Sequence, residues 1–358
     1  MLAVRILIVT AGFLAIAGIA AAAGTTPPTT IVHSPSPVAA VTQDGGLLAW
    51  ISINRTKCNA VHITGDGNSF VLPQPLNGGM TCRWSLAAGV PRLAIAAGAS
   101  AALWTLHQGS SNWVVTAQVG GREIAVERLA HQSDGTRWWL GGITGGGTTL
   151  AYSTVDVEYV DPLACGSGGS CAKKIADGGI ELVTAGQKTP LPNSAPALGL
   201  AVSDGRIAYI PATAVTKTGA PVSSANAAVH VQDASDGSDV SQANPVGVPI
   251  AIGLSSHVLA VLSRSAGKKK LAWFDATTGA RLGGIAVPAT TSPVLAVDDQ
   301  VIVYRVGQYL HALTVATGHG QVVGRMALGA IDLSLDAGRL VWAESGQSSG
   351  RIRALSVP

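Results

Sequence analysis

Charged and aromatic side chains are both scarce in this chain. Of its 358 residues, 12% are Asp, Glu, Lys or Arg and 4% are Phe, Trp or Tyr. The net charge is +3, and loss of an N-terminal segment containing Arg5 leaves 22 of the 23 basic residues against 20 acidic ones. Such a small positive surplus gives no electrostatic basis for binding a polyanion. We therefore exclude nucleic acid as a partner.

Signals for helices and for enzyme chemistry are also missing. No segment after the N-terminal stretch repeats apolar residues at helical spacing, and the eight histidines include no pair at metal-binding spacing. Residues 346–350 (Gly-Gln-Ser-Ser-Gly) match the nucleophile-elbow pattern, but the required His does not follow them. The aspartates of residues 233–239 have a spacing that calcium can use, yet Asp and Gly are also ordinary turn residues. The sequence predicts no catalytic residue, no metal and no cofactor.

Glycine is abundant, with 44 residues, and some of these glycines lie in a stretch of sequence that is repeated. Each copy is a polar turn followed by a short β-run that usually ends in a small residue and an aromatic one. The clearest copy is Ser203-Asp204-Gly205-Arg206-Ile207-Ala208-Tyr209. Seven copies occur, and their last residues are Trp50, Trp104, Tyr152, Tyr209, Val261, Tyr304 and Trp342.

The copies recur with the period of a propeller blade. The steps between their last residues are 54, 48, 57, 52, 43 and 38 residues, and a period of about 40 to 50 residues is typical of a four-stranded antiparallel blade. In the fifth period, four β-runs lie at 249–254, 258–262, 271–275 and 282–287. We therefore predict an all-β fold, a seven-bladed β-propeller that forms one domain.

The last blade needs a strand from elsewhere. Its period supplies β-runs at 331–335, 339–343 and 351–357. A β-prone run at 29–33 (Thr-Thr-Ile-Val-His) precedes the first period and has no partner there. We predict that this N-terminal run becomes the outer strand of the last blade, which closes the ring and removes an open sheet edge.

The repeat resembles a known family. The signature strands are followed by strands that end in turns such as 274–279 (Phe-Asp-Ala-Thr-Thr-Gly) and 315–318 (Val-Ala-Thr-Gly). This pattern, over residues 29–358, is similar to the TolB-type and WD-like propeller repeats of bacteria. The resemblance implies the propeller fold and no particular activity, because propellers carry many unrelated functions.

The first 23 residues have the features of a secretory signal. They contain one cation, Arg5, then an uncharged stretch at 6–20 and an Ala-rich end. We predict cleavage after Ala23, a lead-in at 24–28 and the propeller at 29–358, in a secreted or extracytoplasmic protein of the bacterial cell envelope. The alternative is an uncleaved membrane anchor, because residues 6–23 approach the roughly 20 residues that a spanning helix needs.

The four cysteines fall on one predicted rim of the propeller. Four cysteines allow three pairings, and disulfides are the expected state in an exported chain. The blade assignments favour two bridges. One joins the first blade to the connection that leads to the second blade, and the other lies within a long loop of the third blade. The predicted pairs are Cys58 with Cys82 and Cys165 with Cys171.

Loop lengths indicate where a partner binds. The connections between second and third strands are long at 156–178, 212–227 and 263–269, and they share a rim with the connections between blades. Variable loops on a rigid scaffold commonly carry function. We expect one ring of the neighbouring Trp138 and Trp139 to pack between blades and the other to lie near the rim. The candidate binding residues are Tyr159, Asp161, Lys173, Lys174, His131, Arg137, Trp138, Lys268 and Lys269.

Two hypotheses follow. The preferred one is an exported, monomeric, non-enzymatic propeller that binds a protein, peptide or cell-envelope ligand through its loop-rich face. The alternative is a lyase or hydrolase, similar to streptogramin lyases or lactonases, with its site in the central channel. The alternative requires His, Asp or Glu side chains from three or more blades to meet within about 5 Å. A channel lined by Ala, Gly, Ser and Val disfavours it.

Overall fold

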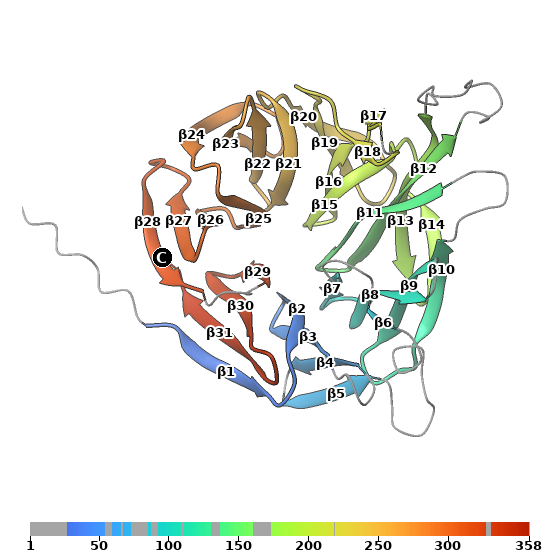
Figure 1. The fold of residues 1–358 in the computed structure, drawn as a ribbon, viewed down its shortest axis with the longest axis vertical. Helices are drawn as coiled ribbons and strands as arrows, with labels where there is room; N and C mark the ends of the chain where they lie inside the picture. The colour runs from blue at the N-terminus through green and yellow to red at the C-terminus, as the bar shows by residue number, and fades with distance from the viewer. Residues whose placement is uncertain are drawn as a thin grey trace, which may run out of the picture.

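The computed structural model contains seven β-sheets arranged around one axis (Figure 1). Every regular element in the described part of the chain is a β-strand. The structure describes residues 27–53, 59–65, 67–72, 85–86, 92–108, 111–129, 137–159, 173–217, 219–326 and 331–357. The predicted all-β, seven-bladed propeller is confirmed.

The first three blades use strands β2 to β14, which follow one another from the axis outward in each blade. Blade 1 consists of β2 (Val38–Asp44), β3 (Leu47–Ser52), β4 (Ala60–Gly65) and β5 (Asn68–Leu72). In blade 2, β6 (Ser85–Leu86) and β7 (Leu93–Ala96) both pair with β8 (Ala101–Gln108), which is followed by β9 (Ser111–Gln118) and β10 (Ile124–Leu129). Blade 3 consists of β11 (Arg137–Gly146), β12 (Thr149–Tyr159), β13 (Lys173–Thr184) and β14 (Gln187–Pro190).

The other blades repeat this order. Blade 4 consists of β15 (Ala197–Ser203), β16 (Arg206–Pro211), β19 (Val229–Asp233) and β20 (Asp239–Ala243), and it carries a separate hairpin of β17 (Ala214–Val215) and β18 (Pro221–Val222). Blade 5 consists of β21 (Val248–Leu254), β22 (Val258–Ser265), β23 (Lys268–Asp275) and β24 (Arg281–Val287). Blade 6 consists of β25 (Thr291–Val297), β26 (Val301–Val306), β27 (Tyr309–Thr314) and β28 (Gly320–Arg325).

Blade 7 is closed by the N-terminal strand, as predicted. It consists of β29 (Ile331–Asp336), β30 (Arg339–Ser345), β31 (Gly350–Ser356) and β1 (Thr29–Ser34). β1 runs antiparallel to β31, with Thr29 opposite Ala354 and Val32 opposite Ile352. Figure 1 shows β1 lying along the outside of β31, which joins the two ends of the described chain in one sheet.

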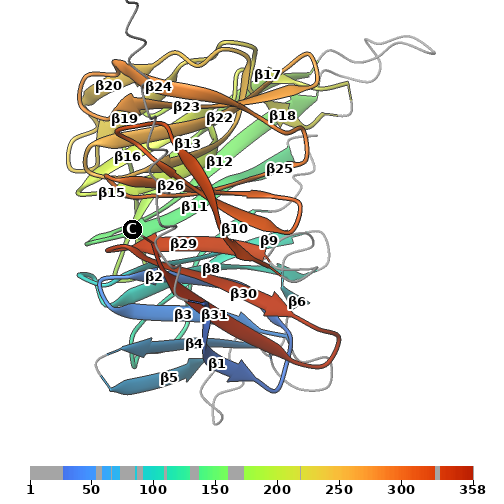
Figure 2. The same ribbon diagram turned by 90° about the vertical axis from the view of Figure 1, so that its left-hand side faces the viewer.

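The side view in Figure 2 shows the two ends of the strands, which form two different faces. The turn face carries the short turns within hairpins, such as 204–205, 234–238 and 337–338. The loop face carries the connections between second and third strands and between blades, such as 212–228, 244–247 and 288–290. Because β1 is antiparallel to β31, the chain enters the propeller at Thr29 on the turn face.

Turn chemistry explains the repeated residues. Asp204 and Gly205 both have left-handed backbone conformations, with φ of +47° and +70°, which suit a two-residue hairpin turn. In the 233–239 turn, Asp233 Oδ1 accepts hydrogen bonds from the Ser235 amide and hydroxyl, and Gly237 N donates to Asp233 O. Asp233 therefore has a role in the backbone of this turn.

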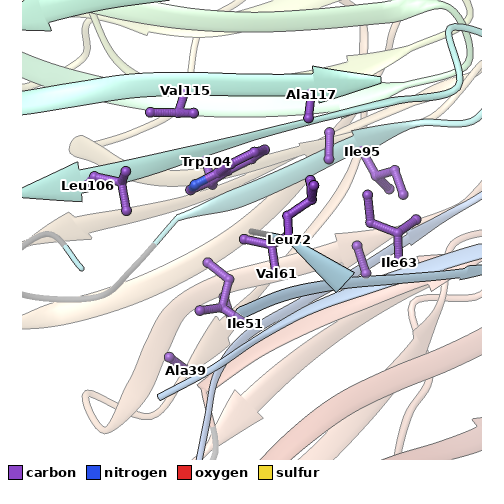
Figure 3. Close-up of a cluster of buried hydrophobic side chains, with 13 residues drawn as sticks. Ala39, Ile51, Val61, Ile63, Leu72, Ile95, Trp104, Leu106, Val115 and Ala117 are labelled. Carbon is purple, nitrogen blue, oxygen red and sulfur yellow. The ribbon is translucent and has the colours of Figure 1, made fainter. Parts of the chain in front are cut away.

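The hydrophobic core lies between neighbouring blades. The signature residue of each second strand packs there, aromatic in six blades and Val261 in blade 5, and Trp104 and Trp342 are both completely buried. Figure 3 shows Trp104 between blades 1 and 2, facing Ile51, Val61 and Leu72 of blade 1. The signature aromatics are thus packing residues that hold one blade against the next.

The expectation of a long loop at 263–269 is wrong, and the expectation of a signal at 1–23 is not tested. The segment 263–269 is not a long loop, because β22 and β23 continue to a tight turn at Ala266 and Gly267, with φ of +49° and +77°. The predicted signal at 1–23 lies outside the described residues. Within the described ranges, no helix is long and apolar enough to cross a membrane.

Candidate binding face

The strands of blade 3 extend further on the loop face than those of the other blades. Its first three strands have 10, 11 and 12 residues, so their loop-face ends extend beyond the usual blade. Within this end, Trp138 pairs with Asp156 and Glu158 pairs with Lys174. The structure thereby brings five of the predicted binding residues to the end of one sheet: Arg137, Trp138, Tyr159, Lys173 and Lys174.

The hairpin of blade 4 supports this extension. Val215 of β17 packs with Trp139, Ile175 and Leu198 around the buried side chains of Val155 and Val157. The hairpin itself is held by backbone bonds, including one from Thr213 N to Val222 O. We call the ends of β11, β12 and β13 together with β17 and β18 the blade 3 platform. Its own small core makes it a rigid surface rather than a free loop.

Of the two tryptophans at the start of β11, Trp139 packs between blades as expected, and the position of the Trp138 ring near the rim stays a prediction. Neighbouring residues of a strand project to opposite sides of the sheet. Trp139 packs into the core of the platform, on Val155 and Val157. Trp138 belongs to the other side of β11 and is half-buried. Trp138 therefore lies on the side of the blade 3 sheet opposite to Trp139, at the loop-face end of the blade.

Charged side chains surround the platform. Lys174 Nζ lies 3.1 Å from Glu158 Oε2, and the two side chains are 68% and 49% exposed. An exposed pair of this kind contributes little to stability. Both groups therefore remain free to exchange this contact for one with a charged partner.

The lysines of blade 5 lie on the same face but apart from the platform. Lys268 is exposed beside the Ala266–Gly267 turn. Lys269 Nζ donates a 2.5 Å hydrogen bond to the carbonyl oxygen of Thr291, which ties blade 5 to the start of blade 6. Lys269 therefore has a structural role, and Lys268 is the cation that this blade offers to a partner.

Several predicted residues fall outside the described part of the chain. These are His131 and Asp161, and the side chains of Arg137 and Tyr159, whose backbones alone are described. All four cysteines fall there too, so the pairs Cys58–Cys82 and Cys165–Cys171 remain predictions.

Three histidines stack on signature aromatics. Trp50 and His62 are direct cross-strand partners with ring centroids 4.7 Å apart and nearly parallel rings. Tyr209 with His230 and Tyr304 with His311 repeat this arrangement in blades 4 and 6. Burial lowers the pKa of each histidine in these pairs. These three histidines therefore pack on aromatic residues of the neighbouring strand.

His62 also contacts a serine. Its Nε2 lies 2.8 Å from Ser52 Oγ, and Ser52 is 7% exposed. A nucleophilic serine needs access to substrate and a third group that orients the histidine. The Trp50 ring provides the orientation here, and Ser52 is enclosed. The contact is therefore best understood as the satisfied hydrogen bond of a buried serine.

The turn-face end of the central channel is an acidic cavity of about 380 Å³. Most of its carboxylates have structural partners. Asp44 Oδ2 accepts bonds from Ala97 N and Gly147 N, which joins blades 1, 2 and 3. Asp298 Oδ1 accepts bonds from two amides of its own turn. Within the described ranges, no group of three His, Cys, Asp or Glu residues is placed to hold a metal ion. The lining residues with carboxylates are Asp44, Asp204, Asp298, Asp299 and Asp336.

The sequence interpretation missed two charged residues of the innermost strands. Arg92 lies just before β7, and its guanidinium donates a 2.5 Å hydrogen bond to the carbonyl oxygen of Gly141 in blade 3. Asp332 lies in β29 and accepts a bond from Val41 N of blade 1. The residues that precede the partners of the signature positions are Ala or Gly in blades 1, 3, 4 and 5, so a charged residue stands out there only once the strand register is known.

No model of a protein family matches the chain, and comparison with curated proteins finds no match. Solved structures do match. The β-propeller domain of the Trilobed protease from Pyrococcus furiosus has a TM-score of 0.50 at 7% identity, covering 91% of this chain and 94% of that one. The β-propeller domain of Cps50 (Swd1) from Myceliophteria thermophila has a TM-score of 0.50 at 11% identity, covering 93% of this chain and 100% of that one.

At such identities the likeness shows the fold alone. Both structures are described as β-propeller domains, so the propeller part of the resemblance is supported. The TolB-type family stays a prediction. The Pyrococcus domain is described as having an open velcro topology, whereas the ring of this chain is closed by β1 and β31.

Proposed function

We propose that this protein is an exported, non-enzymatic β-propeller that binds a protein, peptide or cell-envelope ligand through the blade 3 platform. The observation that carries the proposal is the extension of three long strands beyond the ring and their packing against the β17–β18 hairpin. A surface held by its own core is preorganised, and preorganisation lowers the entropic cost of binding.

The chemistry of the platform suits a macromolecular partner. Trp138 is a half-buried aromatic residue at this end of the blade, and tryptophan is one of the residue types that most often dominate binding energy. Lys174 and Glu158 offer exposed charges of both signs, which contribute to orientation and association rate more than to affinity. The enzymatic alternative gains no support from the described residues, where no metal-binding group forms.

We infer export of the protein from its N-terminal segment, and this part of the proposal is tested separately. Cleavage after Ala23 predicts that the mature protein begins at Gly24. N-terminal sequencing of protein from the extracellular or envelope fraction checks this directly. An intact Met1 in a membrane fraction would identify the anchored form.

The binding proposal is tested by site-specific photo-crosslinking in the native host. A photoreactive amino acid replaces Lys174 or Ala214 on the platform, both of which are exposed, and Ala185 or Ala337 on the turn face provides matched controls. We expect one discrete crosslinked product from both platform positions and none from the two controls. Crosslinks from the turn face alone would assign the partner to the opposite side and overturn the proposal.

A further inference from the structure

The charges of blades 5 and 6 are separated along the strands. These two blades contain three acidic residues, Asp275, Asp298 and Asp299, and all three lie on the turn face. Their Lys and Arg residues number seven, and only Arg281 lies on the turn face. The loop face of these blades is therefore basic, although the net charge of the whole chain is only +3. The cations at the loop-face ends of strands are Arg264, Lys268, Lys269, Lys270, Arg305 and Arg325.

The basic surface is continuous from blade 5 to blade 6. Lys269 Nζ donates to the carbonyl oxygen of Thr291 at the start of blade 6, and Thr291 pairs with Val306. Val306 pairs with Tyr309, and Tyr309 pairs with Arg325. These contacts lead from the tip of blade 5 to the tip of blade 6. We call the loop-face ends of β22, β23, β26, β27 and β28 the basic rim.

Two cations of the basic rim lie directly opposite each other in one sheet. Arg264 of β22 pairs with Lys269 of β23, so both side chains project from the same side of blade 5. Like charges in this position destabilise a sheet. Among the described residues, neither cation forms an ion pair with an acidic side chain. The fold itself therefore does not explain why both positions are basic.

Two further lysines project from the other side of β23. Lys268 and Lys270 alternate with Lys269 along the strand, and both are exposed. Neither forms an ion pair within the described ranges. A lysine carries a compact charge on a flexible stem with three rotatable donors. Such cations suit a surface with many mobile anionic groups better than one anion in a fixed position.

Apolar side chains are exposed beside these cations. Tyr309 is 49% exposed, and the central guanidinium carbon of Arg325 lies 6.0 Å from the centre of its ring. Val246 is 50% exposed, and its carbonyl oxygen accepts a 2.7 Å hydrogen bond from Ser263 Oγ, next to Arg264. Tyrosine is enriched at membrane–water interfaces. Binding to a bilayer surface gains both from buried apolar area and from attraction between cations and anionic lipids.

We propose that the basic rim docks the protein on the surface of an anionic lipid bilayer. The cations attract the lipid phosphates, and the exposed side chains of Tyr309 and Val246 enter the headgroup region. Asp298 and Asp299 lie at the opposite ends of the same blades, where an anionic surface repels them. The distribution of charge thus orients the propeller with its loop face toward the bilayer.

The strength of docking should depend on the number of cations and on salt. Each Lys or Arg close to an anionic bilayer strengthens binding about fivefold, so Lys268 and Lys270 together should contribute about 25-fold. Salt screens this attraction, because the Debye length falls from about 8 Å at physiological ionic strength to about 3 Å in 1 M salt. The basic rim shares no residue with the blade 3 platform, so the two surfaces can be tested separately.

The test is co-sedimentation of the full mature chain with lipid vesicles. The chain should bind vesicles of equimolar phosphatidylglycerol and phosphatidylcholine, and it should not bind vesicles of phosphatidylcholine alone. The double variant Lys268→Gln/Lys270→Gln should bind the anionic vesicles more weakly by about tenfold or more. Arg281→Gln/Arg339→Gln is the matched control, because it removes two exposed cations from the turn face. The control should change binding by less than about twofold.

The substituted lysines and arginines are all exposed, so these variants should keep the fold, which circular dichroism checks. No binding of the unmodified chain to anionic vesicles would overturn the proposal, and so would equal losses in the two double variants. Soluble poly-L-glutamate provides a further arm. If it released the chain from the vesicles at an equal concentration of charged groups, the basic rim would belong to an acidic polypeptide instead. None of these results bears on the platform, which lies on blade 3.

Discussion

Val38 N donates a 2.7 Å hydrogen bond to Ser345 Oγ, across 307 residues of sequence. The Ser345 hydroxyl in turn donates to the Val38 carbonyl oxygen. The two residues belong to the first and last blades, so this reciprocal contact lies at the seam where the ring closes. Together with the β1–β31 pairing, it makes the first and last parts of the described chain one structural unit.

Replacing Ser345 with Ala should lower the free energy of unfolding by about 1–3 kcal/mol, because it leaves an enclosed amide without its acceptor. Urea denaturation followed by tryptophan fluorescence measures the loss. Ser356→Ala is the matched control, since Ser356 is exposed at the end of β31 and should change stability by less than about 0.5 kcal/mol. Equal effects of the two variants would show that the seam contact is not important.

The packing between blades 1 and 2 depends on Trp104, which is completely buried against Ile51, Val61 and Leu72 (Figure 3). Trp104→Ala should cost about 3–5 kcal/mol by leaving a cavity. Trp104→Phe should cost less, because the indole Nε1 has no hydrogen-bond partner to lose among the described residues. Val322→Ala is the control, since Val322 is 54% exposed. Differential scanning calorimetry gives the ranking, and a Phe variant as damaged as the Ala variant would contradict it.

The seam between blades 5 and 6 should weaken in acid. Asp299 accepts hydrogen bonds from Ser256 Oγ at 2.5 Å and from His257 N at 2.8 Å. Burial by itself raises the pKa of Asp299, but the hydrogen bonds from Ser256, Ser255 and His257 outweigh it and hold the pKa well below its usual range. A depressed carboxylate pKa stabilises the fold above the unfolded-state pKa and loses that contribution as the pH falls.

Asp299→Asn should therefore be less stable than the unmodified protein at pH 7, and the gap should close as the pH falls from about 4 toward 2. Urea denaturation at several pH values measures the gap. Asp336→Asn, which changes a carboxylate lining the same cavity, should show a smaller difference. A gap that stays constant with pH would show that the carboxylate charge of Asp299 does not contribute to the seam.

Most of the fold could be predicted from short stretches of sequence. The turn residues of 203–209 and the β-prone run at 29–33 both report short-range preferences, and these sufficed to place blades and ring closure. Residues 268–270 are all lysine, so their polarity concealed that β23 begins at Lys268. Cross-strand pairing to β22, rather than side-chain burial, makes them a strand.

The candidate sites were less predictable, for a physical reason. Arg264 and Arg325 are far apart in the chain, and they reach the same face of neighbouring blades only through the directions of their strands. The platform was partly predictable, because the loop between its second and third strands is visibly long. Its support by Val215 of blade 4 was not, because that contact joins separate blades.

The central claim is that the blade 3 platform binds the partner, and the most direct measurement is the affinity of the crosslinked partner for two purified variants. Trp138→Ala removes a half-buried tryptophan side chain from the platform and should weaken binding by about 30-fold or more, as expected of an aromatic hot spot worth about 2 kcal/mol. Arg281→Glu reverses an exposed charge on the turn face and should change affinity less than about twofold. An unchanged affinity in Trp138→Ala, with a large loss in Arg281→Glu, would contradict the account.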